Sequence, residues 1–382
     1  MFRISSISSL LFLLLCVCGV TSVAQQVALT DKKATKETVQ LYRNLQKLRA
    51  KGFLFGHQDD LAYGVNWKYV PGNSDIKQVV GDYPALYGWE LGGIEVPGQK
   101  HNLDSVPFTN MKQYIEEGYK RGGVISLSWH AQSPFGKPGG AWDTTHGSVA
   151  SVLPGGANHT KYLQWLDKVA AFIASLKGSK NEAVPILFRP FHELTGTWFW
   201  WCQNACTVDE YKALWKFTRS YLQEQKQLHN LIWVYNTGGD FTTEADYMER
   251  YPGDEQVDVL TFDTYQYGSV ADGKNFATNT NKRLGLVGEI ATKHNKLFAI
   301  GETGFEQVPD AKWWTEVLLP AIGNNKISWV LLWRNHGYHT EMKKLHYYAP
   351  YKGQVSAPDF LDFYKLSNTI FEKEAKKGKL YK

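Results

Sequence analysis

Eight short runs of strand-forming residues recur along this chain, and each is followed by a longer polar or helical stretch. The runs are mostly continuously apolar rather than alternating, which is typical of parallel strands covered on both faces. They occupy residues 53–57, 85–89, 124–130, 186–192, 231–236, 259–265, 297–301 and 328–333. Eight strand–helix units in alternation predict an α/β fold, a (β/α)8 TIM barrel in a single domain. A doubly wound open sheet is the alternative, but the chain has no glycine-rich phosphate-binding fingerprint to favour it.

Helical segments are predicted between the strands, and several carry recognisable end signals. Residues 41–50 end near Gly52, a common residue type after a helix, and residues 208–225 begin after Thr207, a good N-terminal cap. The other predicted helices cover residues 111–120, 162–176, 281–294 and 313–322. A poorly marked helix is expected at 244–250, and residues 360–376 are expected to form a closing C-terminal helix.

The first 24 residues have the pattern of a secretory signal peptide. A short basic start precedes an apolar stretch at 10–20, and small residues at 22–24 provide a cleavage site. The apolar stretch is too short for a membrane-spanning helix. We therefore expect residues 25–382 to be exported to the periplasm or out of the cell. Lipoprotein anchoring through Cys16 or Cys18 is the alternative, although neither follows the small residue expected before a lipidated cysteine.

Charge and cysteine content narrow the possible functions. The formal net charge of +5 is spread along the chain without a basic block, which argues against nucleic-acid binding. After the signal peptide the cysteines are Cys202 and Cys206, which could form a small disulfide in an oxidising compartment or remain two buried thiols. They have no companion ligands at zinc spacing. His336, His339 and His346 have no acid at helical spacing, so we interpret them as loop and surface histidines and predict no metal site.

Polar and aromatic residues accumulate where the predicted strands end and their loops begin. Active sites of TIM barrels lie at this end of the barrel. The clusters are Gly56-His57-Gln58-Asp59-Asp60, Gly88-Trp89-Glu90, Ser128-Trp129-His130, His192-Glu193, Asp263-Thr-Tyr265-Gln-Tyr267, Gly301-Glu302 and Trp333-Arg334-Asn335-His336. The sequence therefore predicts a functional site at the carboxyl ends of the strands.

Two glutamates, Glu193 and Glu302, follow the fourth and seventh predicted strands, on roughly opposite walls of the barrel. Glycosidases that retain anomeric configuration need two carboxyl groups about 5–5.5 Å apart, one as acid/base and one as nucleophile. Glu193 has apolar and aromatic neighbours, which raise the pKa of a carboxyl group and suit a proton donor. Glu302 is the expected nucleophile, held ionised by Tyr265 and Arg334, and Asp263 is expected to support one of these two. An ordinary solvated loop residue is the alternative for either glutamate.

Other residues at the strand ends are weaker candidates, and each has an alternative structural role. His130 and His192 could bind sugar hydroxyls or the carboxylates, or be core histidines bonded to the backbone. Glu90 could accept hydrogen bonds from a sugar or pair with a loop arginine. Candidate platforms for sugar stacking are Trp129, Trp142, Trp198 and Trp333, with core packing as the alternative.

Taken in order, these segments resemble those of glycoside hydrolase family 26, chiefly its secreted β-mannanases. The matching segments span nearly the whole mature chain. They are Gly56-His57-Gln58, Tyr87-Gly-Trp-Glu90, Ser128-Trp-His130, Arg189-Pro-Phe-His-Glu193, Asp263-Thr-Tyr265, Gly301-Glu302 and Trp333-Arg334. The Arg-Pro-x-His-Glu segment is the most specific, because related barrel glycosidases usually have Asn rather than His before the acid/base glutamate.

The resemblance implies a retaining β-1,4-mannanase that hydrolyses mannan or galactomannan without a metal or organic cofactor. It implies Glu193 as acid/base and Glu302 as nucleophile, with Tyr265 hydrogen-bonded to the nucleophile. The substrate-binding residues that it implies are Glu90, His130, His192, Trp198, Trp333 and Arg334. The expected products are manno-oligosaccharides or mannobiose, and the expected oligomeric state is a monomer.

Three alternative functions remain open. Relatives within the family cut mixed-linkage β-glucan or β-1,3-xylan. A non-catalytic glycan-binding protein would keep the aromatic platforms, although binding needs no pair of carboxylates. A metal-dependent deacetylase or hydrolase would need His and Asp ligands that converge at strand ends.

Residues 132–158, rich in Gly, Pro and Trp, are expected to form a long loop. If this loop closes one end of the cleft, the enzyme releases short units from a chain end rather than cutting internally.

Overall fold

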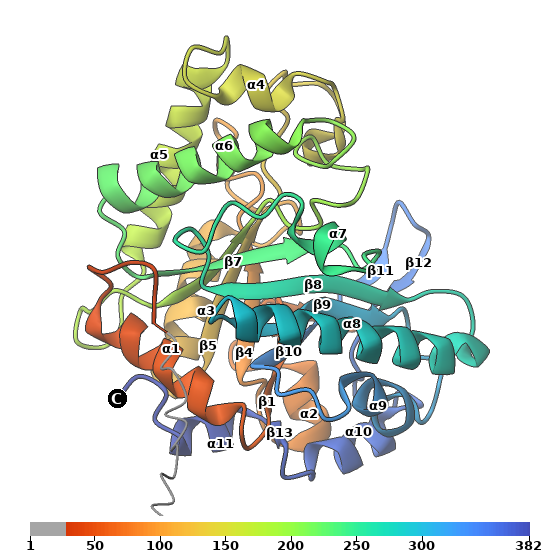
Figure 1. The fold of residues 1–382 in the computed structure, drawn as a ribbon. Coiled ribbons are helices and arrows are strands. Elements are labelled where there is room, and N and C mark those ends of the chain that lie inside the picture. The colour runs from red at the N-terminus through yellow and green to blue at the C-terminus, as the bar shows by residue number, and fades with distance from the viewer. Residues whose placement is uncertain (1–27) are drawn as a thin grey trace, which may run out of the picture.

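The computed structural model describes residues 28–382, so the predicted signal peptide lies outside the described residues. The centre of the protein is a closed barrel of eight parallel strands (Figure 1). In chain order they are β1 (Phe53–Gln58), β4 (Leu86–Glu90), β5 (Val124–Trp129), β6 (Ile186–Pro190), β7 (Leu231–Thr237), β8 (Val259–Gln266), β9 (Leu297–Phe305) and β10 (Trp329–Leu332). Each strand pairs with the next, and β10 pairs with β1 to close the barrel. The predicted TIM barrel is confirmed.

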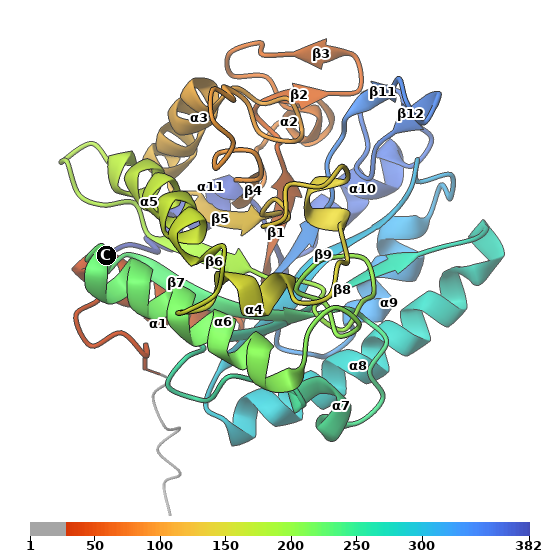
Figure 2. The same cartoon turned by 90° about the horizontal axis from the view of Figure 1, so that it is seen from above.

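Burial on both faces explains why the strands read as continuous apolar runs. Every residue of β1, β4, β5, β6 and β9 is buried. One face of each strand points into the barrel, and the other packs under the helices that surround it (Figure 2). The pattern is typical of parallel sheets covered on both sides.

Helices alternate with the strands and cover the outside of the barrel. They are α1 (Lys36–Leu48), α3 (Phe108–Arg121), α5 (His159–Ser175), α6 (Val208–Ser220), α7 (Glu244–Met248), α8 (Gly273–Lys293) and α9 (Leu319–Ile322). Helix α6 begins with a capping box in which Thr207 and Glu210 exchange hydrogen bonds. The predicted helices at 208–225 and 313–322 are present, but each includes a π-helical turn, Tyr221–Gln225 and Trp313–Leu318.

Smaller elements lie in the loops that follow the strands. The β2–β3 hairpin (Tyr63–Gly64 and Trp67–Lys68) and α2 (Asp75–Val80) follow β1, and the β11–β12 hairpin (Gly337–His339 and Lys344–His346) follows β10. Residues 132–158, predicted to be a loop, contain a 3-10 turn (Gly140–Trp142) and α4 (Ser148–Val152). The carboxyl end of the barrel is therefore surrounded by loops that contain short helices and hairpins.

The end of the chain departs from the predicted single helix. It forms α10 (Ala357–Tyr364), the short strand β13 (Thr369–Ile370) and α11 (Glu372–Lys377). Strand β13 pairs in parallel with the start of β1, and the Phe53 amide donates to the Asn368 carbonyl at 3.0 Å. The prediction of one helix over 360–376 was wrong because a local helical pattern contains no information about this long-range pairing, which satisfies backbone groups of β1.

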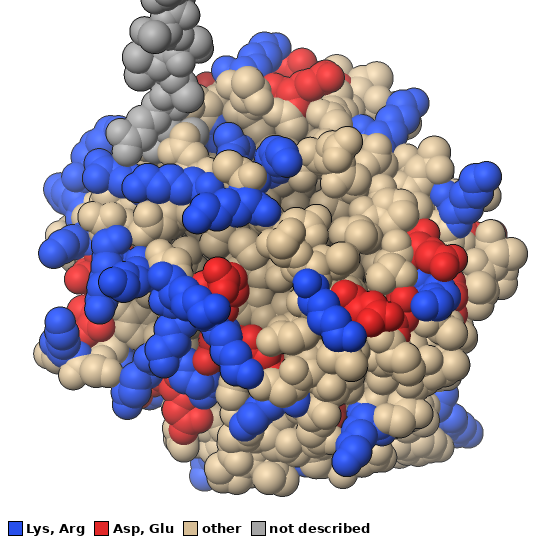
Figure 3. Space-filling view, turned by 90° about the horizontal axis from the view of Figure 1, so that it is seen from below, with Lys and Arg blue, Asp and Glu red and all other residues tan. Residues whose placement is uncertain are grey.

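One face of the protein is richer in basic than in acidic side chains (Figure 3). Seen from below, this face carries many Lys and Arg side chains and fewer acidic ones (Figure 3). Helices α1 and α11 lie on this side (Figure 1), and Asn44 of α1 donates to the Leu380 carbonyl at 3.0 Å. None of the described helices is long and apolar enough to cross a membrane.

Candidate active site

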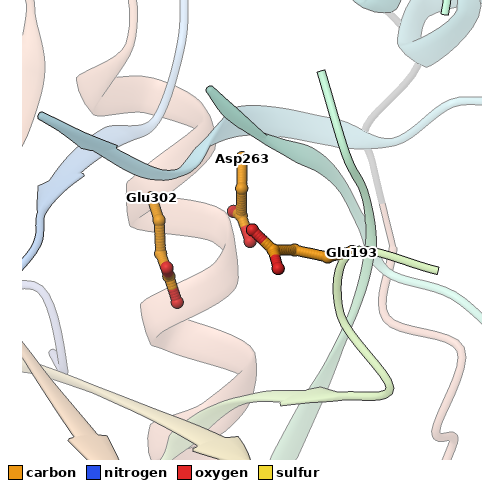
Figure 4. Close-up of side chains that lie close together, drawn as sticks. All are labelled: Glu193, Asp263 and Glu302. Atoms are coloured by element: carbon orange, nitrogen blue, oxygen red, sulfur yellow. The ribbon is translucent and has the colours of Figure 1, made fainter. Parts of the chain in front are cut away.

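Three carboxylates converge at the carboxyl ends of β6, β8 and β9 (Figure 4). Glu302 lies within β9 and Asp263 within β8, whereas Glu193 lies in the turn directly after β6. One carboxylate oxygen of each residue lies within 4.8 Å of the others. Retaining glycosidases hold their two carboxyl groups at about 5–5.5 Å, whereas inverting enzymes hold them about 6.5–9.5 Å apart to admit a water. The spacing of Glu193 and Glu302 suits the retaining mechanism.

Glu302 takes its direction from a β-bulge in β9. The pairing of β8 with β9 skips Gly301, so that Asp263 lies opposite Glu302. A bulge changes the face to which the following side chains point. Only glycine fits at the bulge, because a Cβ atom on Gly301 would lie 2.0 Å from Oδ1 of Asn236. The Gly301-Glu302 motif is therefore a bulge that aims a carboxylate.

Glu193 occupies a strained turn. Phe191 and Glu193 both have left-handed backbone conformations, with φ of 52° and 53°. Residues other than glycine rarely adopt this conformation, and it persists where the surroundings enforce it. The cost of the turn is offset by contacts from the loop that follows.

Side chains of this loop and of helix α6, which follows it, hold three successive carbonyl groups of the turn. The Tyr211 hydroxyl donates to the Phe191 carbonyl at 3.3 Å. Nε1 of Trp201 donates to the His192 carbonyl at 2.8 Å. The Cys202 thiol donates to the Glu193 carbonyl at 3.3 Å. Trp201 and Cys202, in the loop between β6 and α6, therefore fix the backbone around Glu193 rather than facing a ligand.

Cys202 and Cys206 are buried free thiols in this structure, which is the second of the two predicted alternatives. Burial is the main cause that raises the pKa of Cys202 to about 12 and that of Cys206 to about 11. Both groups are therefore neutral at physiological pH. A neutral thiol can donate its hydrogen, as Cys202 does to the backbone of Glu193.

Burial and a neighbouring charge hold a proton on Glu193. Burial is the larger cause and the Glu302 carboxylate adds to it, so that the pKa of Glu193 rises to about 7. The hydrogen bond from Nε1 of Trp198 to Oε2 of Glu193, 2.7 Å long, partly opposes this rise. The Trp198 ring packs over Gly196, where a Cβ atom would lie 2.6 Å from the indole. Glu193 can therefore donate a proton near neutral pH.

Glu302 is held between a tyrosine and a buried arginine. The Tyr265 hydroxyl donates to Oε2 of Glu302 at 2.8 Å, which is the predicted hydrogen bond. Arg189 forms an ion pair with Oε1 of Glu302 and a second one with Asp263, at 2.9 Å. The Arg189 guanidinium thus supplies positive charge beside both carboxylates. Arg189, rather than the predicted Arg334, is therefore the arginine that pairs with Glu302.

Sequence reasoning missed Arg189 although a signal was present. Arg189 is a charged residue inside an otherwise apolar strand, and buried arginines need a partner. Asp263 is one such partner, so the expectation that it supports Tyr265 or Arg334 was wrong. Burial raises the pKa of Asp263 well above its usual value, and Glu302 adds to the rise while Arg189 opposes it. By distance alone the three carboxylates could ligate a metal ion, but the Arg189 guanidinium already supplies positive charge to two of them.

Replacing Arg189 by leucine is expected to lower the free energy of unfolding by about 3–5 kcal/mol at neutral pH, because two buried carboxylates lose their counter-charge. The loss should shrink in acid, because Asp263, whose pKa is raised, takes up a proton and then needs no counter-charge. Urea unfolding of the variant and the wild type, at neutral pH and in acid, measures this loss of stability. The control is Lys365→Met, which removes an exposed pair with Asp362 and should change stability by less than about 1 kcal/mol. Equal stability of Arg189→Leu and the wild type would contradict the inferred charge balance.

Arg334 pairs with a carboxylate other than Glu302. Its Nε atom lies 2.9 Å from Oδ1 of Asp104, a buried residue in the loop after β4. Its guanidinium also lies 5.4 Å from the ring centroid of Trp333. Arg334 therefore joins the loops after β4 and β10, and the prediction that it holds Glu302 ionised was wrong. Because both arginines stand near strand ends, their positions in the sequence do not show which of them pairs with Glu302.

Glu90 positions a histidine and has no oxygen left for a sugar. The residue is fully buried, and its Oε2 atom accepts hydrogen bonds from Nδ1 of His130 at 2.8 Å and from the Ser128 hydroxyl at 2.5 Å. Its Oε1 atom accepts from the backbone amides of His130 and Gly92, at 2.7 and 2.6 Å. The predicted contact of Glu90 with substrate is therefore wrong.

His130 and His192 form a coupled pair behind Glu193. Their Nε2 atoms lie 3.0 Å apart. Although burial opposes it, the Glu90 carboxylate raises the pKa of His130. Burial and the neighbouring His130 lower the pKa of His192 well below its usual value. His130 therefore binds a proton more readily than His192, one of the two rings donates to the other, and the pair forms the floor beside Glu193.

The tryptophans proposed as sugar platforms occupy different environments. Trp129 is fully buried and donates to Glu95 at 3.2 Å, so it has the second of its two predicted roles, core packing. Trp142 is 51% exposed and stacks on His130, with ring centroids 5.3 Å apart. Trp198 is 41% exposed, and Trp333 is partly exposed. These three rings remain available to a ligand.

The three C-terminal histidines lie closer together than expected of separate loop residues. The ring centroids of His336 and His339 are 4.8 Å apart, and those of His339 and His346 are 5.9 Å apart. His346 is buried and its Nδ1 atom lies 2.8 Å from Glu306, so the interpretation as a surface residue was wrong for it. Within the described residues, the three histidines do not form a group with metal-ligand geometry.

Comparison with known proteins identifies the family to which this chain is similar. A sequence model of glycosyl hydrolase family 26 matches residues 30–315. The mannan endo-1,4-beta-mannosidase of Bifidobacterium adolescentis is 31% identical over 360 residues, which cover 90% of this chain and 35% of that protein. The enzyme of the same name from Thermothelomyces thermophilus is 29% identical over 294 residues, which cover 74% of this chain and 54% of that protein. The chain thus spans between a third and about half of the length of these curated relatives.

Solved structures agree with the sequence comparison. The GH26 β-mannanase BoMan26A from Bacteroides ovatus is 45% identical with a TM-score of 0.85, and the match covers 91% of this chain and 98% of that one. A modular endo-β-1,4-mannanase from Cellulomonas fimi is 31% identical with a TM-score of 0.80, covering 91% of this chain and 78% of that one. Because the family match extends over most of the chain and the same fold recurs in these structures, the protein belongs to glycosyl hydrolase family 26.

Proposed function

We propose that the protein is a retaining β-1,4-mannanase that hydrolyses mannan or galactomannan to manno-oligosaccharides or mannobiose by double displacement. The observation that carries the proposal is the pair Glu193 and Glu302, with carboxylate oxygens within 4.8 Å and contrasting surroundings. Burial keeps a proton on Glu193, whereas Arg189 and Tyr265 stabilise the charge of Glu302. The names of the curated relatives support mannan as the substrate.

In the first step an oxygen of Glu302 attacks the anomeric carbon of a mannosyl unit. The bond from that carbon to the glycosidic oxygen breaks, and its electron pair stays with the oxygen. Glu193 transfers its proton to this oxygen, and the shortened chain leaves. The products on the enzyme are a mannosyl ester of Glu302 and a deprotonated Glu193.

In the second step Glu193 acts as a base. Esterification removes the negative charge of Glu302, which is one of the causes that raise the pKa of Glu193. The pKa of Glu193 therefore falls in the intermediate, and the carboxylate can accept a proton from water. The water oxygen attacks the anomeric carbon, the ester bond breaks, and both glutamates return to their starting states.

The sugar beside the scissile bond would contact the exposed part of Trp198 and the partly exposed Trp333, above the floor formed by His130 and His192. The indole of Trp198 donates to Glu193 through its nitrogen and presents its ring face to solvent. This arrangement suits stacking of an apolar sugar face next to the proton donor. We also infer from the pattern of residues 1–24 that the protein is exported, to the periplasm or beyond. We propose separately that it acts as a monomer.

The test is a time course of products from linear mannan, galactomannan and manno-oligosaccharides. Mixed-linkage glucan and β-1,3-xylan serve as comparison substrates, and each reaction is repeated with EDTA. We expect manno-oligosaccharides with and without chelator. A ladder of sizes indicates internal cleavage, and one dominant short product from the outset indicates action at a chain end. Hydrolysis of glucan or xylan instead of mannan would reassign the substrate, and binding without any hydrolysis would identify a glycan-binding protein.

A further inference from the structure

A groove beside the carboxylates has no role in the mechanism described above. Tyr267 lies directly beyond the end of β8 and is 79% exposed. Its ring centroid is 6.2 Å from that of Tyr265, whose hydroxyl holds Glu302. The groove next to it, of about 200 Å³, is lined by both tyrosines and by residues of α8. Strand β8 and helix α8 run side by side here (Figure 1).

Polar side chains from α8 form a stripe along this groove. Asn275, Asn279 and Arg283 stand four residues apart, so they lie on one face of the helix. The stripe extends for about 12 Å at the rise of an α-helix. Within residues 28–382, none of these three side chains forms a hydrogen bond or an ion pair with another protein group. Their donors and acceptors are available to a ligand.

The groove is lined mostly by polar groups, with Phe276 as its apolar residue, and its rim is fixed. Phe276 lies under the stripe, buried against Trp313 with ring centroids 6.4 Å apart. Gln266 donates to the Ser269 carbonyl at 2.9 Å and accepts from Nε1 of Trp313 at 2.8 Å. The loop that carries Tyr267 is thereby held in place before any ligand binds. Preorganisation of this kind lowers the entropic cost of binding.

We propose that Tyr267 and the stripe of Asn275, Asn279 and Arg283 form a subsite for a sugar unit beyond those at the scissile bond. The exposed tyrosine ring stacks on the apolar face of a pyranose, and the two amides and the guanidinium bind its hydroxyl groups. The ligand class is a neutral hexose unit within the same polysaccharide chain. The inference rests on the proposed function, because it assigns the groove to an extension of that substrate.

The experiment measures kcat and KM of Tyr267→Ala, Tyr267→Phe and Asn279→Ala on manno-oligosaccharides of increasing length and on an activated aryl β-mannoside. Thr278→Ala is the matched control, because it is exposed on the same helix but about 100° around the axis from the stripe. We expect KM of Tyr267→Ala to rise about tenfold on the longest substrates, as for loss of one stacking contact, with a loss that shrinks as the chain shortens. Tyr267→Phe keeps the ring and should stay close to the wild type.

The outcomes separate the subsite from the reaction itself. A wild-type protein that does not cleave mannan overturns the proposed function. An active wild type with a Tyr267→Ala variant that is unchanged at every chain length overturns only the subsite. An equal loss on the aryl mannoside and on long chains also overturns it, because Tyr267 would then act through Tyr265 and Glu302. Binding of a manno-oligosaccharide to Glu302→Ala, with and without Tyr267→Ala, measures the affinity without turnover.

Discussion

Replacing Glu302 by alanine is expected to reduce turnover on every substrate by a factor on the order of 10⁵. The variant lacks the oxygen that forms the bond to the anomeric carbon, so even a substrate with a good leaving group cannot enter the covalent step. The fold should persist, because removal of one carboxylate leaves Arg189 paired with Asp263 at 2.9 Å. The measurement is kcat on mannan and on an aryl β-mannoside, with circular dichroism as the check on folding.

Sodium azide distinguishes the nucleophile from a residue that merely supports the site. Azide can enter the space left by the Glu302 side chain and attack the anomeric carbon directly, which yields a mannosyl azide of inverted, α configuration. Recovery of that product from an activated substrate supports the assignment of Glu302. A variant that retains a tenth of the wild-type rate, or a rescued product of β configuration, would show that another group forms the covalent bond.

Replacing Glu193 by alanine is expected to reduce kcat/KM on mannan by about 10²–10⁴-fold, the usual contribution of a general acid. An aryl mannoside with a good leaving group needs little protonation, so its first step should be spared. The second step still lacks its base, and the intermediate should accumulate. The expected observation is a rapid burst of the aryl product followed by slow turnover. Azide should here give a mannosyl azide of retained, β configuration.

The same residue sets the alkaline limit of activity. The pKa of Glu193 is raised to about 7, and the reactive form carries the proton. Activity of the wild type is therefore present below this pKa and is lost as the pH rises through about 7. In Glu193→Ala this alkaline limb should disappear from the profile of kcat/KM on the activated substrate. A limb that persists unchanged in the variant would assign it to another group, and equal losses on natural and activated substrates would contradict the role of acid/base.

Much of the site could be predicted from the sequence because TIM barrels place functional groups at the carboxyl ends of their strands. Local apolar runs located the strands, and the residues that follow them included Glu193, Glu302 and Tyr265. The partners of these residues were harder to predict. Both Arg189 and Arg334 stand near strand ends, and only their positions in the folded barrel show that Arg189 meets Glu302 while Arg334 meets Asp104.

Burial also decided roles that residue type alone left open. Glu90 and Trp129 have the chemistry of sugar-binding residues, yet both are fully buried. All four hydrogen-bonding positions of Glu90 are used by protein groups, and Trp129 packs in the core. Conversely, the sequence around Tyr267 did not predict a role for it. Its exposure beside α8 suggests that it binds a sugar unit. Exposure depends on what packs against a residue, which a sequence pattern does not contain.

The sequence by itself determined the alternation of strands and helices and the two glutamates at the ends of the fourth and seventh strands, because these follow from periodicity within a few residues. Only the tertiary structure decided the bulge that aims Glu302, the left-handed turn that presents Glu193, and the pairing of β13 with β1. Each of these depends on contacts between segments far apart in the chain. Arg189 and Glu302, separated by 113 positions, are an example: their charges meet because the closed barrel brings β6 and β9 to one mouth.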